Sequence, residues 1–228
     1  MTQRNLLVQY SMMITFDQVS KRYPGGFEAL SQVNFSLQKG EMTFLTGHSG
    51  AGKSTLLKLI ALLEWPTSGQ LTVNGLKLNH LKKRDVAAHR SQLGITFQSP
   101  QLLNDRTVFD NVALPLQIQG VAYPMIAKRV HAALDMVGLL SKEKMLPVHL
   151  SVGEQQRVGI ARAVVHKPAL LLADEPTGNL DPKLSSEIMK IFEQFNQVGV
   201  SILIATHDLA LIAGMKHRIV MLKGGRLC

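Results

Sequence analysis

Residues 47–55 read Gly-His-Ser-Gly-Ala-Gly-Lys-Ser-Thr, which contains the pattern G-x-x-x-x-G-K-S. This pattern is typical of the phosphate-binding loops of nucleotide hydrolases. The apolar residues 42–45 precede it with the composition of a strand, and residues 53–63 follow it with helical spacing. We weigh the motif against a glycine-rich turn that caps an ordinary helix. The strand-to-helix context disfavours that alternative.

Each residue type in the loop has a chemical role. Glycines let the backbone wrap tightly enough for several N–H groups to point at phosphate oxygens. Lys53 places a positive charge against the β- and γ-phosphates, and Ser54 offers a hydroxyl to Mg²⁺. The N-terminus of the following helix adds its positive end. The candidate nucleotide-binding residues of the loop are Gly47, His48, Ser49, Gly50, Ala51, Gly52, Lys53, Ser54 and Thr55.

The composition fits one α/β domain with a substantial core. The chain has 228 residues, of which 46% are hydrophobic. Its apolar runs, such as residues 169–173, are much shorter than the roughly 18 residues of a membrane span. The N-terminus lacks the pattern of a signal peptide. The single cysteine, Cys228, cannot form an internal disulfide, and we expect a reducing, cytoplasmic environment.

The chain is strongly basic, with a formal net charge of +9. We expect most basic residues to lie on solvated helix faces, and attraction to an anionic membrane surface is the alternative. No nucleic-acid partner is expected, because aromatic residues make up only 5% of the chain and are not interleaved with the basic ones. The basic residues that gather in the sequence are Lys77, Lys82, Lys83, Arg84, Arg90, Lys128, Arg129, Lys142 and Lys144.

Strand and helix patterns alternate toward both ends of the chain, whereas the middle is mainly helical. The pattern predicts strands at 14–19, 33–37, 42–46, 70–73, 93–97, 170–173, 200–205 and 219–222. It predicts helices at 53–63, 81–92, 108–118, 125–137, 151–165 and 182–197. This order indicates an α/β fold, in which a helical subdomain at about 100–165 is inserted into a parallel-sheet core. Residues 1–12 read as an N-terminal extension of a single domain, 13–228.

A pair of carboxylates ends the apolar run 170–173, where Asp174 and Glu175 follow. A strand that is buried on both faces brings its C-terminal residue to the ligand crevice. Asp174 can hold Mg²⁺ there, usually through water. Glu175 points in another direction and can orient or deprotonate the attacking water. An acidic exit from a strand into a loop is the structural alternative, which the phosphate-binding loop upstream disfavours.

The stretch Leu150–Arg157, LSVGEQQR, is similar to the signature sequence of ABC-type ATPases. With the other two motifs, the resemblance covers nearly the whole chain. Tyr23 matches the aromatic residue that stacks on adenine, and Gln98 matches the glutamine that contacts Mg²⁺ and water. His207 matches the histidine that contacts the γ-phosphate. Residues Asn179–Asp181 resemble the loop that crosses the dimer interface.

The resemblance implies an ABC ATPase domain: a P-loop nucleotide hydrolase core with a small antiparallel β subdomain and the helical insert. It also implies a head-to-tail homodimer, in which each ATP lies between the phosphate-binding loop of one subunit and the signature helix of the other. Ser151 is then expected to cap a helix N-terminus, which is a ready anion site. The implied residues outside the loop are Glu175, His207 and Gln98 for catalysis, Gln98 and Asp174 for Mg²⁺, and Tyr23, Ser151, Gly153, Glu154 and Asp181 for the nucleotide.

Several stretches resemble the cell-division members of the ABC ATPases, and His48 in the loop is the most telling position. The matching stretches are 46–60, 105–108, 110–113, 158–165 and 198–200. This resemblance implies an integral membrane partner at the cytoplasmic face of the bacterial inner membrane, at the division site. Hydrolysis is expected to send a conformational signal across that membrane to septal cell-wall hydrolases. Cytoskeletal division proteins are further candidate partners.

One residue departs from the family's pattern. The signature normally has two adjacent glycines, and Val152 replaces the first. Valine disfavours a positive φ, so it is tolerated if the position requires only helical φ and its bulk does not meet the partner's phosphates. We expect tolerance. Two alternatives to the cell-division function stay open: a nucleotide-dependent binding module with weak turnover, and the ATPase of a lipoprotein-release or small-substrate transporter.

The family's docking surface for a membrane partner lies around the glutamine loop. The corresponding region here is 99–106 with the helices after it. Leu102 and Leu103 are candidate exposed anchors within it, and burial in the core is the alternative for both.

Overall fold

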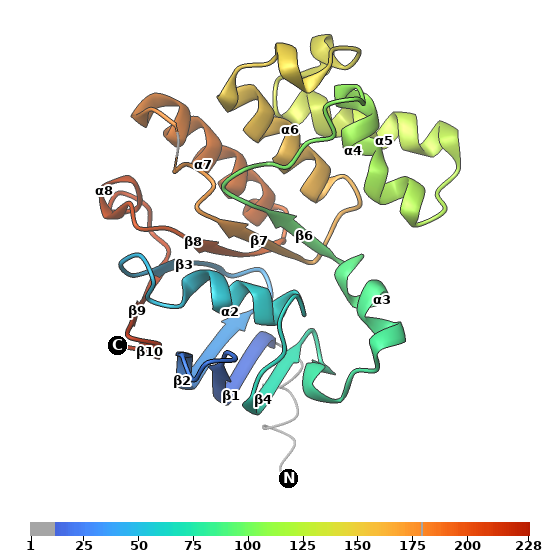
Figure 1. Cartoon of the computed structure of the whole chain (residues 1–228). Helices are drawn as coiled ribbons and strands as arrows, with labels where there is room; N and C mark the ends of the chain where they lie inside the picture. The colour runs from blue at the N-terminus through green and yellow to red at the C-terminus, as the bar shows by residue number, and fades with distance from the viewer. Residues whose placement is uncertain (1–11, 179) are drawn as a thin grey trace.

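A six-stranded sheet crosses the centre of the molecule and carries the phosphate-binding loop (Figure 1). The computed structural model describes residues 12–178 and 180–228. The strand order is β10-β9-β3-β8-β7-β6, and all neighbours are parallel except β10 and β9. The strands are β3 (Met42–Thr46), β6 (Leu93–Thr96), β7 (Leu170–Asp174), β8 (Ser201–Ala205), β9 (Arg218–Lys223) and β10 (Arg226–Leu227).

The central strands are apolar along their length because both faces of this sheet are covered. Every residue of β3 and β8 is buried, as is every residue of β7 except Asp174. Alternate residues of one strand serve two different cores. Phe44 lies in the cluster formed with the helical part, and Leu45 lies in the cluster formed with α2 and the second sheet.

The second sheet is antiparallel and lies beside the first, as the resemblance implied. Its order is β2-β1-β4-β5. One face of this sheet packs into the core that it shares with α2. Its buried residues there include Phe16, Leu37 and Leu71. The strands are β1 (Met12–Arg22), β2 (Glu28–Gln38), β4 (Ser68–Val73) and β5 (Leu76–Lys77).

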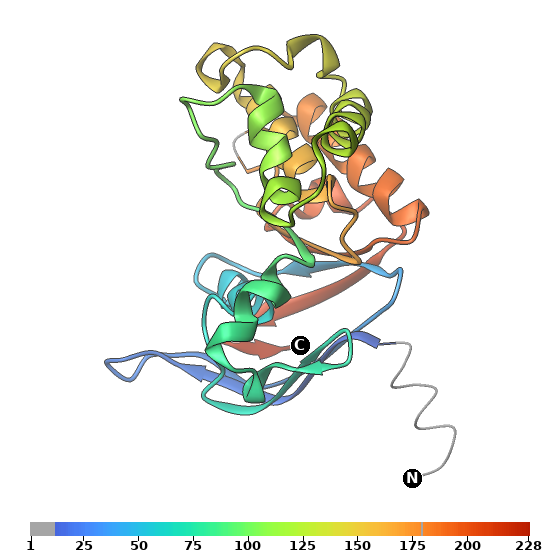
Figure 2. The same ribbon diagram turned by 90° about the vertical axis from the view of Figure 1, so that its right-hand side faces the viewer.

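Three of the longer helices gather at one end of the molecule (Figure 2). Figure 2 shows α4, α5 and α6 gathered at one end, with the antiparallel strands at the other. The α-helices are α2 (Lys53–Ile60), α3 (Val86–Arg90), α4 (Val108–Ile118), α5 (Tyr123–Met136), α6 (Val152–Val164), α7 (Pro182–Gln197) and α8 (Leu209–Ile212). Short 3-10 helices span Leu78–His80, Lys83–Asp85, Leu140–Lys142 and Pro147–His149. In the part that the structure describes, no helix combines the length and apolar character that a membrane crossing needs.

Two predicted helices are shorter than expected. The helix after the loop ends at Ile60, and Leu62 takes a left-handed φ of 51°. The helix expected over 81–92 is a 3-10 turn followed by α3, because Leu81 is extended. Three short elements, β5, α8 and β10, are absent from the prediction. The proposed extension 1–12 lies outside the described residues except for Met12, which starts β1.

Most of the basic residues that gather in the sequence are exposed, as expected, and three of them have side-chain partners: Arg84, Arg90 and Lys142. Arg90 donates hydrogen bonds to the carbonyls of Ala61 (3.1 Å) and Leu62 (2.5 Å), which ties α3 to the end of α2. Lys142 forms an ion pair of 2.5 Å with Glu154. Arg90 remains exposed while it makes these bonds, whereas Lys142 is partly buried.

Candidate nucleotide site

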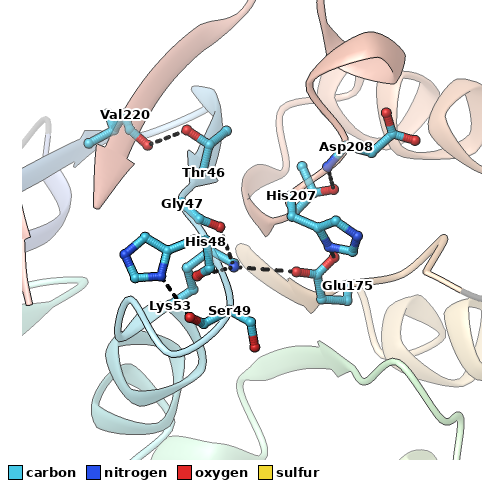
Figure 3. Close-up of polar contacts among 10 residues, drawn as sticks. Thr46, Gly47, His48, Ser49, Lys53, Glu175, His207, Asp208 and Val220 are labelled. Carbon is cyan, nitrogen blue, oxygen red and sulfur yellow. Dashed lines mark hydrogen bonds and ion pairs between the residues drawn. The ribbon is translucent and has the colours of Figure 1, made fainter. Parts of the chain in front are cut away.

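Three neighbouring strands deliver the residues of the site. The phosphate-binding loop joins β3 to the N-terminus of α2. Strand β8 lies beside β3, and β7 lies beside β8, all parallel. Their C-terminal ends therefore meet at one edge, where Glu175 follows β7 and His207 follows β8 (Figure 3). This juxtaposition follows from topology, as expected for the crevice of an open α/β sheet.

Two glycines in the loop lie so close to the backbone of neighbouring strands that a side chain at either position would clash. Gly47 has a φ of 148°, and a Cβ there would lie 2.2 Å from the carbonyl oxygen of Leu222. Gly52 has a φ of 109°, and a Cβ there would lie 2.6 Å from the carbonyl oxygen of Ala29. The loop thus wraps tightly between β9 and β2, a conformation that lets backbone amides face a phosphate.

Lys53 and Glu175 form a buried polar contact at the mouth of the loop (Figure 3). Lys53 Nζ donates to the carbonyls of Gly47 (2.7 Å) and His48 (3.3 Å). It also lies 3.5 Å from Glu175 Oε1, in an ion pair. The other carboxylate oxygen, Oε2, accepts from His207 Nδ1 at 2.8 Å. Both oxygens of Glu175 are therefore engaged.

The backbone at Glu175 is held in an uncommon conformation. Its φ is 49°, in the left-handed region that non-glycine residues rarely adopt. Its amide donates to the carbonyl of Ala205 at 2.9 Å, which ties the exit of β7 to the end of β8. Backbone strain of this kind concentrates at functional sites. It aims the side chain at Lys53 and His207.

Asp174 is the last residue of β7 and faces Ser54. Its Oδ1 atom is buried and has no hydrogen-bond partner among the described residues. Burial raises the pKa of Asp174, and the hydroxyl of Ser54 and the charge of Lys53 oppose that rise. An orphaned carboxylate oxygen beside a hydroxyl suits a hard cation. The described residues contain no group of three or more His, Cys, Asp or Glu that could form a complete metal cage.

The loop opens into a cleft of about 580 Å³. Gln98, which follows β6, lines it together with Glu175 and His207. Phe27, whose side chain is 63% exposed, lines it too. Phe27 is not predicted from the sequence, although an aromatic residue just after the turn 23–26 is a signal that points to it.

Tyr23 lies near the cleft without lining it. Its hydroxyl is 3.5 Å from Thr55 Oγ1, and its ring lies under the ammonium of Lys21 at 4.8 Å. The predicted stacking of Tyr23 on adenine stays a prediction.

The signature residues do not line this cleft. Ser151 caps α6, as expected: its Oγ accepts from the amide of Glu154 at 3.3 Å, and the Glu154 carboxylate accepts from the amide of Ser151 at 3.0 Å. Asp181 caps α7, where its Oδ1 accepts from the amides of Lys183 (2.9 Å) and Leu184 (3.0 Å). A Cβ on Gly153 would lie 3.1 Å from Leu184, so the starts of the two helices pack together. The start of α6 and the phosphate-binding loop therefore lie at separate places in one chain.

Val152 is the first residue of α6 and has a helical backbone. Its side chain is 60% exposed. The backbone condition for tolerance is therefore met.

The comparisons with known proteins agree with this geometry. The profile of the ABC transporter family matches residues 30–178. The chain belongs to the ABC transporter family. This ABC ATPase is 58% identical over 215 residues to the Escherichia coli K12 "Cell division ATP-binding protein FtsE", covering 94% of this chain and 97% of that one. It is 52% identical to the protein of the same name from Haemophilus influenzae, covering 94% and 99%.

A solved structure shares the fold and most of the length. It is described as the dimeric structure of a post-hydrolysis state of the ATP-binding cassette MJ0796 bound to ADP and Pi. The TM-score is 0.86 at 34% identity, and the match covers 94% of this chain and 96% of the other. This ABC ATPase is an ATP-binding protein and an ATP hydrolase.

Proposed function

We propose that Glu175 is the base that activates water for ATP hydrolysis, with Lys53 and His207 as its partners. The observation that carries this is the contact of one carboxylate with both the loop lysine and the histidine. Neither contact is between sequence neighbours, and both lie at the mouth of the phosphate-binding loop. General-base assistance of this kind contributes typically about 10²–10⁴-fold to a rate.

ATP binding is expected to rearrange these contacts. In this structure, Lys53 donates hydrogen bonds to two carbonyl groups of its own loop. The phosphates of ATP are charged and therefore stronger acceptors than these carbonyls. The transfer of Lys53 to the β- and γ-phosphates releases Glu175 Oε1. His207 keeps its hydrogen bond to Oε2 and so orients the carboxylate, while Gln98 faces the same cleft and can position water.

The residues present fit a magnesium ion. Asp174 has an orphaned buried oxygen, and Ser54 supplies a hydroxyl beside it. We propose these two residues, with Gln98, as its protein contacts. When bound, Mg²⁺ neutralises charge on the phosphates. A site with few protein ligands agrees with the preference of Mg²⁺ for retained waters.

The proposed active unit is a homodimer. The phosphate-binding loop and the signature helix are separate in one chain, and the amides of Val152 and Gly153 at the start of α6 have no helical partner. A head-to-tail pair would place this helix start against the γ-phosphate held by the other subunit. The related cassette of 34% identity is described as dimeric.

The cellular role that we propose is that of the cell-division proteins named FtsE. The chain would pair with an integral membrane partner of the FtsX type at the cytoplasmic face of the inner membrane, at the division site. ATP-driven changes would then control septal cell-wall hydrolysis. Support comes from the 58% identity over nearly the full length. In the docking region, Leu103 is 42% exposed, whereas Leu102 packs against the core.

The first prediction concerns the base. Glu175→Gln keeps the shape of the side chain and removes its basicity, so ATP should still bind while hydrolysis slows by about tenfold or more. Phosphate release under single-turnover conditions measures the rate, and a fluorescent ATP analogue measures binding. Near-normal turnover would remove Glu175 from the role of base.

A further inference from the structure

A groove lies at the edge of the main sheet opposite the nucleotide cleft. Its cavity volume is about 730 Å³. Pro168 and Val200, which line it, come just before β7 and β8, whereas Glu175 and His207 follow the same two strands. Because the strands are parallel, these positions fall at opposite edges. The groove and the nucleotide cleft share no lining residue.

The walls of the groove are apolar and partly exposed. Helix α5 buries one side in the core. Met125, Ala132 and Met136, at helical spacing, line the groove instead, and the two methionines remain 45% and 48% exposed. Val198, just after α7, is 76% exposed on the same groove. Apolar side chains that gather in an exposed hollow mark a binding surface, and methionine adapts its shape to a partner.

The charged residues that line the groove, among the described part of the chain, are all positive. Lys128, Arg129 and Lys167 line it, and no acidic residue does. Within residues 12–178 and 180–228, none of the three forms an ion pair. The complementary ligand therefore carries apolar anchors flanked by carboxylates. A lipid surface is flat and would leave a hollow of this volume unfilled.

Two helices connect the groove to the proposed dimer interface. Helix α6 starts at Val152 and has 13 residues, so it reaches about 20 Å to the groove at Val164. Helix α7 starts at Pro182 and has 16 residues, so it spans about 24 Å and ends next to Val198 in the groove. An occupant would contact the far ends of both helices without covering the nucleotide.

We propose that this groove is a docking site for an acidic amphipathic helix of a partner protein. Apolar residues at i, i+3, i+4 and i+7 of that helix would enter the groove between α5 and the end of α7. Carboxylates on its flanks would pair with Lys128, Arg129 and Lys167.

The test uses the full chain and a fluorescent synthetic peptide of about 18 residues, with leucines at this spacing and glutamates on the flanks. Its control has the same composition in a shuffled order. We expect the ordered peptide to bind at least about tenfold more tightly than the shuffled one. Reversing the charges with Lys128→Glu, Arg129→Glu and Lys167→Glu should weaken binding by about tenfold or more.

The matched control reverses three exposed cations outside the groove: Lys77→Glu, Lys82→Glu and Lys83→Glu. This variant should bind the peptide within about twofold of the original chain. A separate variant, Met136→Gln, changes the apolar wall without a charge and should also weaken binding. The groove shares no lining residue with the nucleotide cleft, so these substitutions should leave ATP binding unchanged. Measured ATP binding therefore checks that every variant is correctly folded.

Three results would overturn the proposal. The first is no saturable binding of the ordered peptide, and the second is equal loss of binding in both charge-reversal variants. The third is binding to anionic phosphatidylglycerol vesicles, but not to the peptide, that depends on the groove cations. That result would assign the cations to a lipid surface.

Discussion

At the scale of single residues, the carboxylate of Glu175 contacts both Lys53 and His207. The sequence predicts each of the three residues from its own motif. It does not predict that both oxygens of Glu175 are engaged, because the contacts depend on the adjacency of β3, β8 and β7. The sequence predicts Asp174 as a magnesium contact, whereas its burial beside Ser54 depends on the fold.

Val152 gives a prediction at this scale. Its backbone is helical and its side chain points largely to solvent, so Val152→Gly should change the rate of ATP hydrolysis by less than about threefold. Steady-state phosphate release, compared between the two proteins at saturating ATP, measures the effect. A large gain in the glycine variant would show that the valine obstructs the partner's nucleotide, and would favour a binding module with weak turnover.

The raised pKa of Asp174 should make the free energy of unfolding depend on pH. Burial raises its pKa, so the folded protein disfavours the charged carboxylate. The resulting loss of stability begins as pH rises above the ordinary pKa of aspartate and is complete above the raised pKa. Asp174→Asn should therefore raise the melting temperature at about pH 8, and raise it less at about pH 4. Calorimetry without nucleotide or Mg²⁺ measures this, and a gain that is the same at both pH values would contradict it.

At the scale of elements, the predicted helices 108–118 and 182–197 match α4 and α7 to the residue. Both have signals at their ends: Thr107 caps α4, and Asp181 followed by proline starts α7. The failures lie where tertiary contacts decide. Strand β5 has only two residues and exists by pairing with β4, and β10 exists by pairing with β9.

The start of α6 gives a prediction at this scale. The Lys142 ammonium, by its hydrogen bond, holds the pKa of Glu154 below its usual range. Lys142→Met would leave an uncompensated negative charge at the helix start where the partner's γ-phosphate is proposed to bind. Hydrolysis should fall by about two- to fivefold, and the double variant Lys142→Met, Glu154→Gln should recover it.

The control for this cycle is ATP binding to the phosphate-binding loop of the same chain, which should not change in either variant. If the double variant is as slow as Lys142→Met alone, the lysine acts through packing and the electrostatic explanation fails.

At the scale of the whole molecule, the sequence predicts one α/β domain but not the distribution of its surfaces. The nucleotide cleft, the signature helix start and the cationic groove lie in different places, and α6 and α7 run from the signature end to the groove. Periodicity predicts that a helix has an apolar side. It cannot predict that Met125 and Met136 remain uncovered, because that depends on which helices lie beside α5.

The central claim is that two copies of this chain complete each ATP site. Sedimentation of the Glu175→Gln variant tests it most directly, because slow hydrolysis preserves the ATP-bound state. With Mg²⁺ and ATP the account predicts a species of twice the monomer mass, which reverts to the monomer when ADP replaces ATP. A variant that stays monomeric while its phosphate-binding loop is saturated with ATP would contradict the account.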